Sequence, residues 1–599
     1  MTDYKTFKNP DQSLPGGGAL RKARTSSGGW KFSLSWLNLT YKVKAKGGYK
    51  TLLDGLNGHV EPGGMLAIMG PSGCGKTTLM NLLADRVSSG VIEGEILVDG
   101  SPRTKDFRFK ASYVAQENAL MDVFTVRETI EFTADLALPS SVPKSEKRER
   151  VDEIIDIMGL RSCEDTRVGG MLFKGISGGQ AKRLSMALSL ITDPCIIMLD
   201  EPTSGLDSSA TINVMQAIKD LASQHKTVIY SIHQPSSEVF AMFDSLLLLT
   251  AGKTIYYGKA SESIDFFTQQ GFQCPAYSNP ADYFLTIVNT DFDGHGDINA
   301  LAEAYELSSK NDDVKRLVQK AKENQSGNPT KGFIKYKANW FAQCYYLAKR
   351  LTINSLLNPA IIWVRVIMYF LVSVTIGGLF FDFDEDAPTA DDSIAALLFF
   401  VQTFFIFLSF GALPYFITQR PVFVRERSNG LIDVLPFVIG NFISVIPPIG
   451  VFAVEATGIT YLMVGLNGYK WYLCIIFLDL IIAESVINIV SAITTDYVVA
   501  IVVCANYNGL MSLSQGFLVP YSEMPLFFQI FNKIGYTKYG YESLMFNHFS
   551  REPNGTQVLI GYEMDDVVLE DYALLFLAFI FAHQFIFFVL IFFFHTGKQ

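Results

Sequence analysis

A phosphate-binding loop is predicted at residues 70–78, where GPSGCGKTT follows a short apolar run, MLAIM (65–69). The helix-like segment TTLMNLLADR continues from it, and this order of strand, loop and helix is the context that a phosphate loop requires. Its glycines let backbone N–H groups surround phosphate oxygens, while Lys76 reaches the β- and γ-phosphates and Thr77 binds Mg²⁺. The alternative is an ordinary glycine-rich turn before a helix. The expected nucleotide-binding residues are Gly70, Pro71, Ser72, Gly73, Cys74, Gly75, Lys76, Thr77 and Thr78.

Two adjacent carboxylates, Asp200 and Glu201, follow a second apolar run, CIIML (195–199). A carboxylate at a strand end beside a phosphate loop can hold Mg²⁺ through water, and a neighbouring carboxylate can orient and deprotonate an attacking water. By itself such a pair is typical of a solvated strand end. Together with the phosphate loop it predicts metal-assisted hydrolysis, with Asp200 as a metal ligand and Glu201 as the catalytic base.

Two further polar side chains follow predicted strands. Gln116 comes after ASYVA (111–115), and His233 comes after TVIYSI (227–232). Both are expected at the same sheet edge as catalytic residues, and Gln116 also as a Mg²⁺ ligand. A surface amide and a structural histidine are the alternatives that these residues leave open.

A second glycine run, ISGGQAKR (176–183), has no lysine set inside its glycines. It precedes a helix-like segment, so a hydroxyl and N–H groups would gather at a helix N-terminus, which favours anions. Either the run is a chance feature of a glycine-rich chain, or it serves a nucleotide held by another copy of the protein.

The order of these motifs resembles the nucleotide-binding domain of ABC transporters, over roughly residues 35–285. The resemblance implies two such domains that bind head to tail, so that the signature motif of one caps the ATP held by the other. It also identifies Ser204–Asp207 as the D-loop and implies that Tyr41 stacks on adenine. The implied ATP-binding residues in trans are Ser177, Gly178, Gly179 and Gln180.

The two halves of the chain differ in composition. The formal charge of −10 argues against a nucleic-acid partner, and 49% of the 599 residues are hydrophobic. Long apolar runs dominate from about residue 360, and each is long enough to cross ~30 Å of hydrocarbon. A buried helix of a soluble domain is the alternative for any one of these runs, but six such runs in succession argue against it. The expected spans are 360–381, 394–416, 438–464, 471–494, 498–519 and 571–594.

Loop charge predicts the orientation of these spans. The first loop, DFDEDAPTADD (382–392), has six acids and no Lys or Arg, whereas TQRPVFVRERSNG (418–430) has three arginines. The second loop is therefore expected inside, the first outside, and both termini in the cytosol. The loop at 520–570 is then external, and it contains a glycosylation sequon at Asn554. None of the seven cysteines falls in that loop, so no disulfide framework is indicated.

The order of an ATPase head before six spans resembles the G subfamily of ABC transporters, whose members are half-transporters. FTVRETIEFTADLALP, NPADYFLTIV, YLMVGL and GFLVP carry this resemblance. The predicted fold is a multidomain chain, an α/β P-loop ATPase head followed by an all-α membrane domain of six helices. The expected ranges are a disordered cytosolic tail (1–34), the head (35–285), a charged linker (286–335), an interfacial helix (336–359) and the membrane domain (360–599).

The expected function is ATP-driven export or flipping of an amphipathic, lipid-like molecule, sterol-like or drug-like, by a homodimer. The plasma membrane is the expected site, with an organelle membrane as the alternative. One rival hypothesis is an obligate heterodimer with a related half-transporter. Such pairs often carry one degraded ATP site, and the intact motifs of this chain argue against that hypothesis. A soluble-type ABC ATPase acting on ribosomes or DNA, and an ATP-hydrolysing channel or regulator, are the others.

An aromatic face on the second span is the expected substrate path. Phe400, Phe404 and Phe407 recur at helical spacing, and the resemblance places this span at the dimer axis, with Phe517 and Leu518 in an apolar plug above it. Ordinary packing or lipid contact is the alternative. Inside the spans, Glu455, Asp479, Glu484 and His583 are equally compatible with a functional and a structural role.

Overall fold

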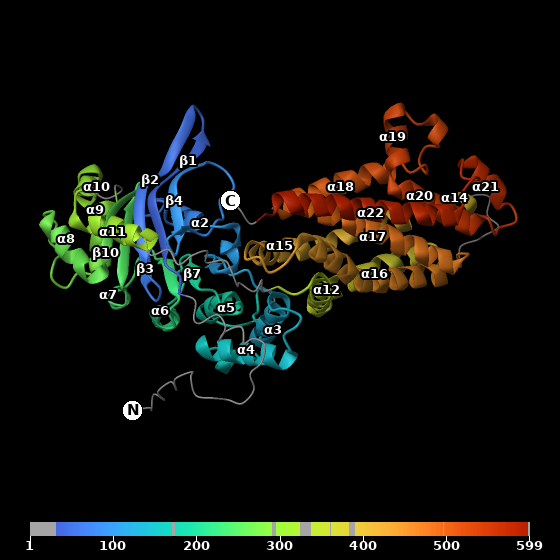
Figure 1. Ribbon diagram of the computed structural model, residues 1–599. Helices are drawn as coiled ribbons and strands as arrows, with labels where there is room; N and C mark the ends of the chain where they lie inside the picture. The colour runs from blue at the N-terminus through green and yellow to red at the C-terminus, as the bar shows by residue number, and fades with distance from the viewer. Residues whose placement is uncertain are drawn as a thin grey trace.

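The computed structural model describes residues 31–170, 174–289, 295–323, 337–359, 361–381, 390–494 and 496–596. It consists of an α/β head joined to an elongated helical bundle (Figure 1). The expected cytosolic tail lies outside the described residues up to residue 30. This arrangement confirms the predicted order of an α/β head followed by an all-α domain.

A six-stranded sheet with the order β10-β9-β3-β8-β7-β6 forms the centre of the head. The five strands from β9 to β6 are parallel, and β10 adds antiparallel to one edge. The inner strands β3 and β8 are buried along their whole length, as their continuous apolar sequences require of a parallel sheet covered on both faces. The strands are β3 (Met65–Met69), β6 (Ala111–Val114), β7 (Ile196–Leu199), β8 (Thr227–Ser231), β9 (Ser245–Thr250) and β10 (Lys253–Lys259).

A second, antiparallel sheet has the order β2-β1-β4-β5. Its central strand β1 pairs with both neighbours, with Leu34 opposite Val60 on one side and opposite Val98 on the other. Its buried side chains join the same core as the six-stranded sheet. The strands are β1 (Leu34–Ala45), β2 (Gly48–Val60), β4 (Val91–Val98) and β5 (Ser101–Pro102).

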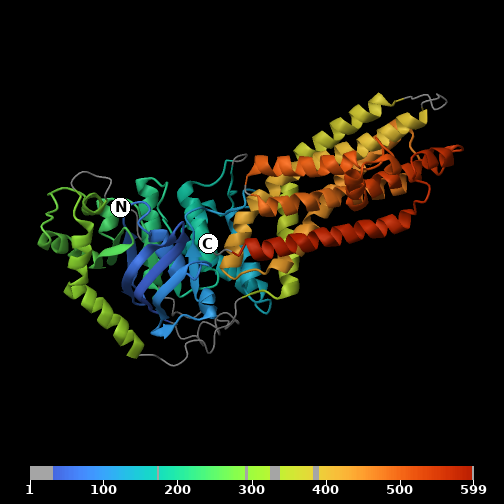
Figure 2. The same cartoon turned by 90° about the horizontal axis from the view of Figure 1, so that it is seen from above.

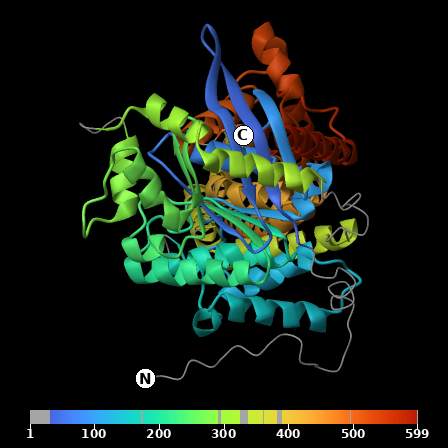
Figure 3. The same ribbon diagram turned by 60° about the vertical axis from the view of Figure 1, so that its left-hand side comes forward.

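Helices lie on both sides of the central sheet (Figure 3). Two of them, α3 and α5, begin with a capping box, in which Thr125 pairs with Glu128 and Ser177 with Gln180. The head helices are α2 (Lys76–Leu83), α3 (Val126–Ala137), α4 (Lys144–Ile157), α5 (Gly178–Leu190), α6 (Ser208–Ser223), α7 (Ser237–Phe240), α8 (Ser263–Gln269) and α9 (Pro280–Val288).

Two helices occupy much of the range expected to be a charged linker. α10 (Ile298–Glu306) packs against β10, and α11 (Ser309–Glu323) packs against β2. Lys310 pairs with Glu262, and Lys322 pairs with Glu95 at 2.5 Å. The described part of this range therefore belongs to the head.

Among the described residues, the membrane domain contains six apolar helices. By length and composition, four of the described helical segments could cross a membrane. One of them, Ala390–Ser428, includes both α14 (Ala390–Leu408) and the helix that follows it. Two further apolar helices, Trp363–Leu379 and Tyr497–Leu513, are shorter. These two have 17 residues each, which is near the lower limit for a span. The six are α13 (Trp363–Leu379), α14 (Ala390–Leu408), α16 (Val434–Val464), α17 (Tyr469–Ile493), α18 (Tyr497–Leu513) and α22 (Leu569–Phe594).

Two helices connect the bundle to the head. α12 (Trp340–Leu357), yellow-green in Figure 2, lies across the ends of the membrane helices and exposes several aromatic side chains, as expected of an interfacial helix. α15 (Leu413–Ser428) continues from α14 towards the head. A buried pair joins them, since Arg350 donates to both carboxylate oxygens of Glu426 at 2.6 and 2.7 Å.

The range expected to be an external loop, 520–570, contains α19 (Leu526–Ile534), α20 (Tyr536–Phe549) and α21 (Gly555–Gly561). α20 packs among α14, α17 and α22, and most of its residues are buried. A Cβ at Gly540 would lie 2.1 Å from the Gln402 amide nitrogen and 2.4 Å from Asp479 Oδ2, so a larger residue there would have to displace the buried Gln402–Asp479 pair. Asn554 is exposed just before α21.

Buried polar pairs tie the membrane helices together. Arg365 of α13 donates to Glu484 of α17 at 3.1 Å, and Gln402 of α14 donates to Asp479 of α17 at 2.8 Å. His583 Nδ1 lies 2.7 Å from the Phe579 carbonyl oxygen. For Glu484 and Asp479 these contacts favour the structural alternative, because each carboxylate joins two helices.

Candidate functional site

The parallel strands bring the predicted catalytic segments to one edge of the central sheet. The phosphate loop follows β3, the loop with Gln116 follows β6, Asp200 and Glu201 follow β7, and His233 follows β8. Because β6, β7, β8 and β3 are adjacent and parallel, their carboxyl ends meet at the same edge, which is where ligands of open α/β sheets bind.

The phosphate loop has the backbone geometry that its glycines predict. Gly70, Gly73 and Gly75 have φ values of 152°, 76° and 110°, and a Cβ at Gly70 would lie 2.1 Å from the Leu249 carbonyl oxygen. The buried Lys76 ammonium donates to the carbonyl oxygens of Gly70 and Pro71 at 2.8 and 2.9 Å. Its charge is therefore held within the loop, where it could meet a phosphate.

Three side chains surround the Asp200 carboxylate, which is 4% exposed. Thr77 Oγ1 and Ser231 Oγ donate to Oδ1 at 3.3 and 2.6 Å, and the Tyr113 hydroxyl donates to Oδ2 at 3.0 Å. Burial, together with the charge of Asp200, raises the pKa of Tyr113 well above its ordinary value. The phenol therefore stays protonated and remains a donor that orients Asp200.

Glu201 is held by its backbone and by its side chain. Its N–H donates to Ser231 Oγ at 2.8 Å, and its carboxylate accepts from Gln116 Nε2 at 2.7 Å. Ser231 thus orients both acidic residues. Ser231 and Tyr113 were not predicted as site residues. Both lie at or near the ends of the strands that lead to His233 and Gln116, and this position is the signal in the sequence that could have found them.

The segment Ser177–Gln180 makes its side-chain hydrogen bonds within itself. Ser177 is exposed, accepts from the Gln180 N–H at 3.3 Å and donates its own N–H to Gln180 Oε1 at 2.8 Å. No hydrogen bond found among the described residues joins this segment to the phosphate loop. Gln180 thus completes the capping box at the start of α5.

His233 is exposed at the sheet edge.

The structure does not support the expected contact of Tyr41 with adenine. Tyr41 is 5% exposed, and its hydroxyl donates to the Ser89 carbonyl oxygen at 2.9 Å. Its ring also lies against Gly90, where a Cβ would be 2.7 Å from Tyr41 Cε2. The β1 position makes Tyr41 part of the core between β1 and the segment before β4, so its ring is not presented to a ligand.

This arrangement can hydrolyse a nucleoside triphosphate. Lys76 and the loop N–H groups can bind the phosphates, and Glu201 can accept a proton from an attacking water. Thr77 Oγ1 and Asp200 Oδ1 face each other at 3.3 Å. Hydroxyl and carboxylate oxygens are the ligands that Mg²⁺ prefers, so this pair fits the metal, which would neutralise phosphate charge when bound.

Comparisons with known proteins agree with this geometry. The ABC transporter family matches residues 53–204, and the ABC-2 type transporter family matches residues 342–549 and, in a second form, 233–325. ABC transporter G family member 1 of Petunia hybrida is 35% identical, with 88% of this chain and 86% of the relative covered. This chain belongs to the G family of ABC transporters.

Other relatives cover most of the chain as well. G family member 13 of Arabidopsis thaliana is 36% identical over 85% of this chain and 80% of its own length. The Broad substrate specificity ATP-binding cassette transporter ABCG2 of Bos taurus is 32% identical over 86% of this chain and 84% of its own. As an ABC transporter of this family, the protein is a multi-pass membrane protein that binds ATP and couples its hydrolysis to transport.

The aromatic residues expected in the substrate path of the transporter occupy different environments. Phe400 and Phe404 are 43% and 47% exposed and stack with ring centroids 6.0 Å apart. Phe407 is half-buried and contacts Phe410. Exposure makes the Phe400–Phe404 pair available to a second chain, to lipid or to a ligand.

Phe517 and Leu518 also differ from each other. The Phe517 ring packs against Phe399 and Tyr541, with centroids at 4.7 and 5.9 Å, whereas Leu518 is 55% exposed. Phe517 is half-buried and packs against the core of its own chain, so its place in an apolar plug stays a prediction. Leu518 keeps a position from which it could contact a partner.

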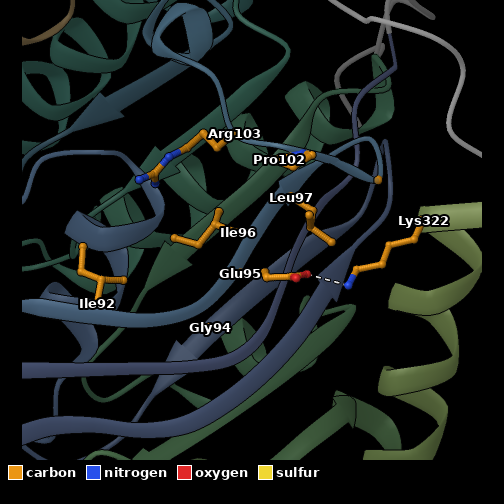
Figure 4. Close-up of a pocket in the computed structure, with 9 residues that line it drawn as sticks. Ile92, Gly94, Glu95, Ile96, Leu97, Pro102, Arg103 and Lys322 are labelled. Carbon is orange, nitrogen blue, oxygen red and sulfur yellow. Dashed lines mark ion pairs between the residues drawn. The ribbon is translucent and has the colours of Figure 1, made fainter.

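An open groove on the head lies beside β4 and α11 (Figure 4). Glu95 and Lys322 form an ion pair across it. It is lined by β4 and β5 residues and by Lys322, and none of the predicted ATP-binding residues belongs to it. The groove is therefore not part of the ATP site.

Proposed function

We propose that two copies of this chain form an ATP-driven exporter or flippase for an amphipathic, lipid-like molecule of the sterol or drug type. The observation that carries the proposal is that Ser177 is exposed, and that no hydrogen bond found among the described residues joins Ser177–Gln180 to the assembled site. That site consists of Lys76, Thr77, Asp200, Glu201 and Gln116. An exposed serine hydroxyl and glycine N–H groups at a helix N-terminus are donors without a phosphate in their own chain. A second head bound in the opposite direction supplies that phosphate.

In this proposal the two heads hold Mg²⁺–ATP between them. Thr77 and Asp200 hold Mg²⁺ with Gln116 nearby, Glu201 acts as the base, and His233 contacts the terminal phosphate. The heads and both termini are cytosolic, the dimer lies in the plasma membrane, and Asn554 is glycosylated on the outside. The three arginines of 418–430 and the acidic 382–392 support this orientation.

The exposed aromatic pair Phe400 and Phe404 supports an apolar path at the dimer axis. A cavity lined by such side chains stabilises apolar ligands by roughly 25 cal/mol per Å² and offers few hydrogen bonds. It therefore favours sterol-like or amphipathic molecules over sugars and ions. The bovine relative is itself named as a transporter of broad substrate specificity, which agrees with recognition by apolar area.

A complementation experiment tests the dimer. One chain carries Lys76→Ala and the other Ser177→Arg, with different tags so that mixed dimers can be purified. If the signature acts in trans, both lesions fall in one site and the other site is intact, so ATPase activity exceeds that of either mutant homodimer. A control dimer pairs a chain that carries both substitutions with a wild-type chain. Each ATP site then has one lesion, so this dimer should show no gain in ATPase activity over the mutant homodimers.

Transport itself is tested with inverted vesicles. Uptake of a fluorescent sterol analogue or of a cationic dye should require ATP and fail with Glu201→Gln. ATP hydrolysis without uptake of any amphipathic probe would favour the rival proposal of a regulator or channel. Mixed dimers that are no more active than the mutant homodimers would contradict the trans site.

A further inference from the structure

A buried lysine joins the signature helix to the loop after β6. Lys182 lies in the second turn of α5, is 3% exposed, and donates to the carbonyl oxygens of Ala115 and Gln116 at 3.0 and 2.8 Å. One turn later on the same face, Ser185 Oγ donates to Asn118 Oδ1 at 2.9 Å. The helix that begins with Ser177 therefore holds this loop at both ends.

The same loop also contacts the catalytic base and the membrane domain. The Gln116 side chain donates to Glu201 at 2.7 Å. At the far end of the loop, the Ala119 carbonyl oxygen accepts a hydrogen bond from Arg425 of α15 at 2.5 Å. The Arg425 guanidinium also lies 3.6 Å from the buried Glu426 carboxylate. Residues 115–119 thus lie between α5, Glu201 and α15.

We propose that Lys182 is a positioning residue that transmits movement of the signature helix to the loop 115–119, and through it to Gln116 and α15. The inference rests on the proposed function, in which Ser177–Gln180 bind the ATP of the partner chain. The Lys182 ammonium is buried, and a charged donor shared by two carbonyl oxygens is stronger than a neutral hydrogen bond. Both carbonyl groups follow the end of β6 at Val114. When α5 moves towards the partner's phosphate, the loop must therefore move with it.

The neighbouring residue provides a matched control. Arg183 also donates to two carbonyl oxygens, those of Met158 and Gly159, at 3.0 and 2.9 Å. Its acceptors lie at the end of α4 rather than in the loop. Arg183→Met therefore removes a cation and two hydrogen bonds from α5 without cutting the tie to residues 115–119.

Hydrogen exchange of the full-length dimer in detergent tests the tie, in a Glu201→Gln background that retains bound ATP. Without further changes, Mg²⁺–ATP should slow exchange in the phosphate loop, in the signature segment and in the loop 115–119. Lys182→Met should reduce the ATP effect on residues 115–119 by about fivefold or more and leave the effect on the phosphate loop unchanged. Lys182→Arg should restore it, and Arg183→Met should not diminish it.

A kinetic measurement in the Glu201 protein gives a second readout. Lys182→Met should lower kcat for ATP about fivefold or more, while KM for ATP stays within about twofold, because no hydrogen bond found among the described residues joins Lys182 to the phosphate loop 70–78. A change in KM alone, or equal losses with Lys182→Met and Arg183→Met, would overturn the proposal. If Lys182→Met does not fold, Lys182→Gln removes the charge and keeps a polar side chain, and an undiminished ATP effect on residues 115–119 in that variant would contradict the proposal.

The two proposals fail in different ways. If ATP does not slow exchange in the signature segment of the Glu201→Gln dimer, the trans site is wrong. If the signature segment is protected and the loop 115–119 still responds fully in Lys182→Met, the trans site stands and the role of Lys182 is wrong. Coupling between separated sites requires this kind of direct evidence.

Discussion

Polar side chains serve different purposes in the head and in the membrane domain. In the head, Gln116, Ser177 and His233 are exposed at strand or helix ends, and Asp200 and Glu201 are oriented by neighbours that leave the sheet edge open to a ligand. In the membrane domain, Arg365 with Glu484 and Gln402 with Asp479 are buried against each other.

The difference follows from the surrounding medium. A polar group at the carboxyl end of a strand can be solvated until a ligand arrives, whereas one among membrane helices must find its partner within the protein. The same residue type therefore indicates a binding site in one half and a link between helices in the other. The buried Arg350–Glu426 pair, at the junction of the two halves, belongs to the second kind.

The largest expected effect is at Glu201 in the head. Glu201→Gln keeps the acceptor for Gln116 but removes the base, so steady-state ATP hydrolysis should fall by about 10²-fold or more while ATP binding persists. Hydrolysis and nucleotide binding of the purified dimer check this. Glu149→Gln, at an exposed site on α4, is the control, and near-wild-type turnover in Glu201→Gln would contradict the assignment.

A second prediction tests the structural role of buried pairs. Glu426→Ala leaves the 4% exposed Arg350 without its partner, which should lower the free energy of unfolding by about 3–5 kcal/mol. Denaturation in detergent measures this. Asp313→Ala breaks the exposed Arg316–Asp313 pair, with side chains 78% and 63% exposed, and should cost less than about 1 kcal/mol. Equal costs would remove the distinction between the two kinds of polar group.

A third prediction concerns the exposed aromatic face of α14. Because Phe404 is largely outside the core, Phe404→Ala should leave folding intact and raise the probe concentration for half-maximal ATPase stimulation by about tenfold, or ~1.4 kcal/mol of lost apolar contact. Phe581→Ala, at a site 75% exposed on α22, should have no such effect. If both variants behave alike, Phe404 is an ordinary lipid-facing side chain.

The smallest effect is expected at Tyr41. Tyr41→Phe loses the hydrogen bond to Ser89 and should reduce stability by about 1 kcal/mol, with ATP affinity unchanged. Thermal unfolding and nucleotide titration of the same preparation check both values. A fall in ATP affinity at unchanged stability would show that Tyr41 contributes to nucleotide binding and would contradict its assignment to the core.

The sequence by itself determined the order of the domains and the composition of the ATP site. Short-range chemistry carries this information: the glycine spacing before Lys76 fixes a loop conformation, and an apolar run before Asp200 fixes a strand end. Because parallel strands end at one edge, four separate motifs could be assigned to one site. The six apolar runs likewise predicted the helices of the membrane domain, since length and hydropathy are local properties.

Contacts between distant segments were decided only by the tertiary structure. It buried Tyr41 against Gly90, placed Ser231 and Tyr113 on Asp200, and gave Glu484 a partner 119 positions away in the chain. It also formed α20 within a range expected to be an external loop, and packed the half-buried Phe517 ring against Phe399 and Tyr541 while leaving Leu518 exposed. In each case the side chain alone allows several partners, and the free energy of burying it against one of them depends on which helices and strands the whole fold brings together.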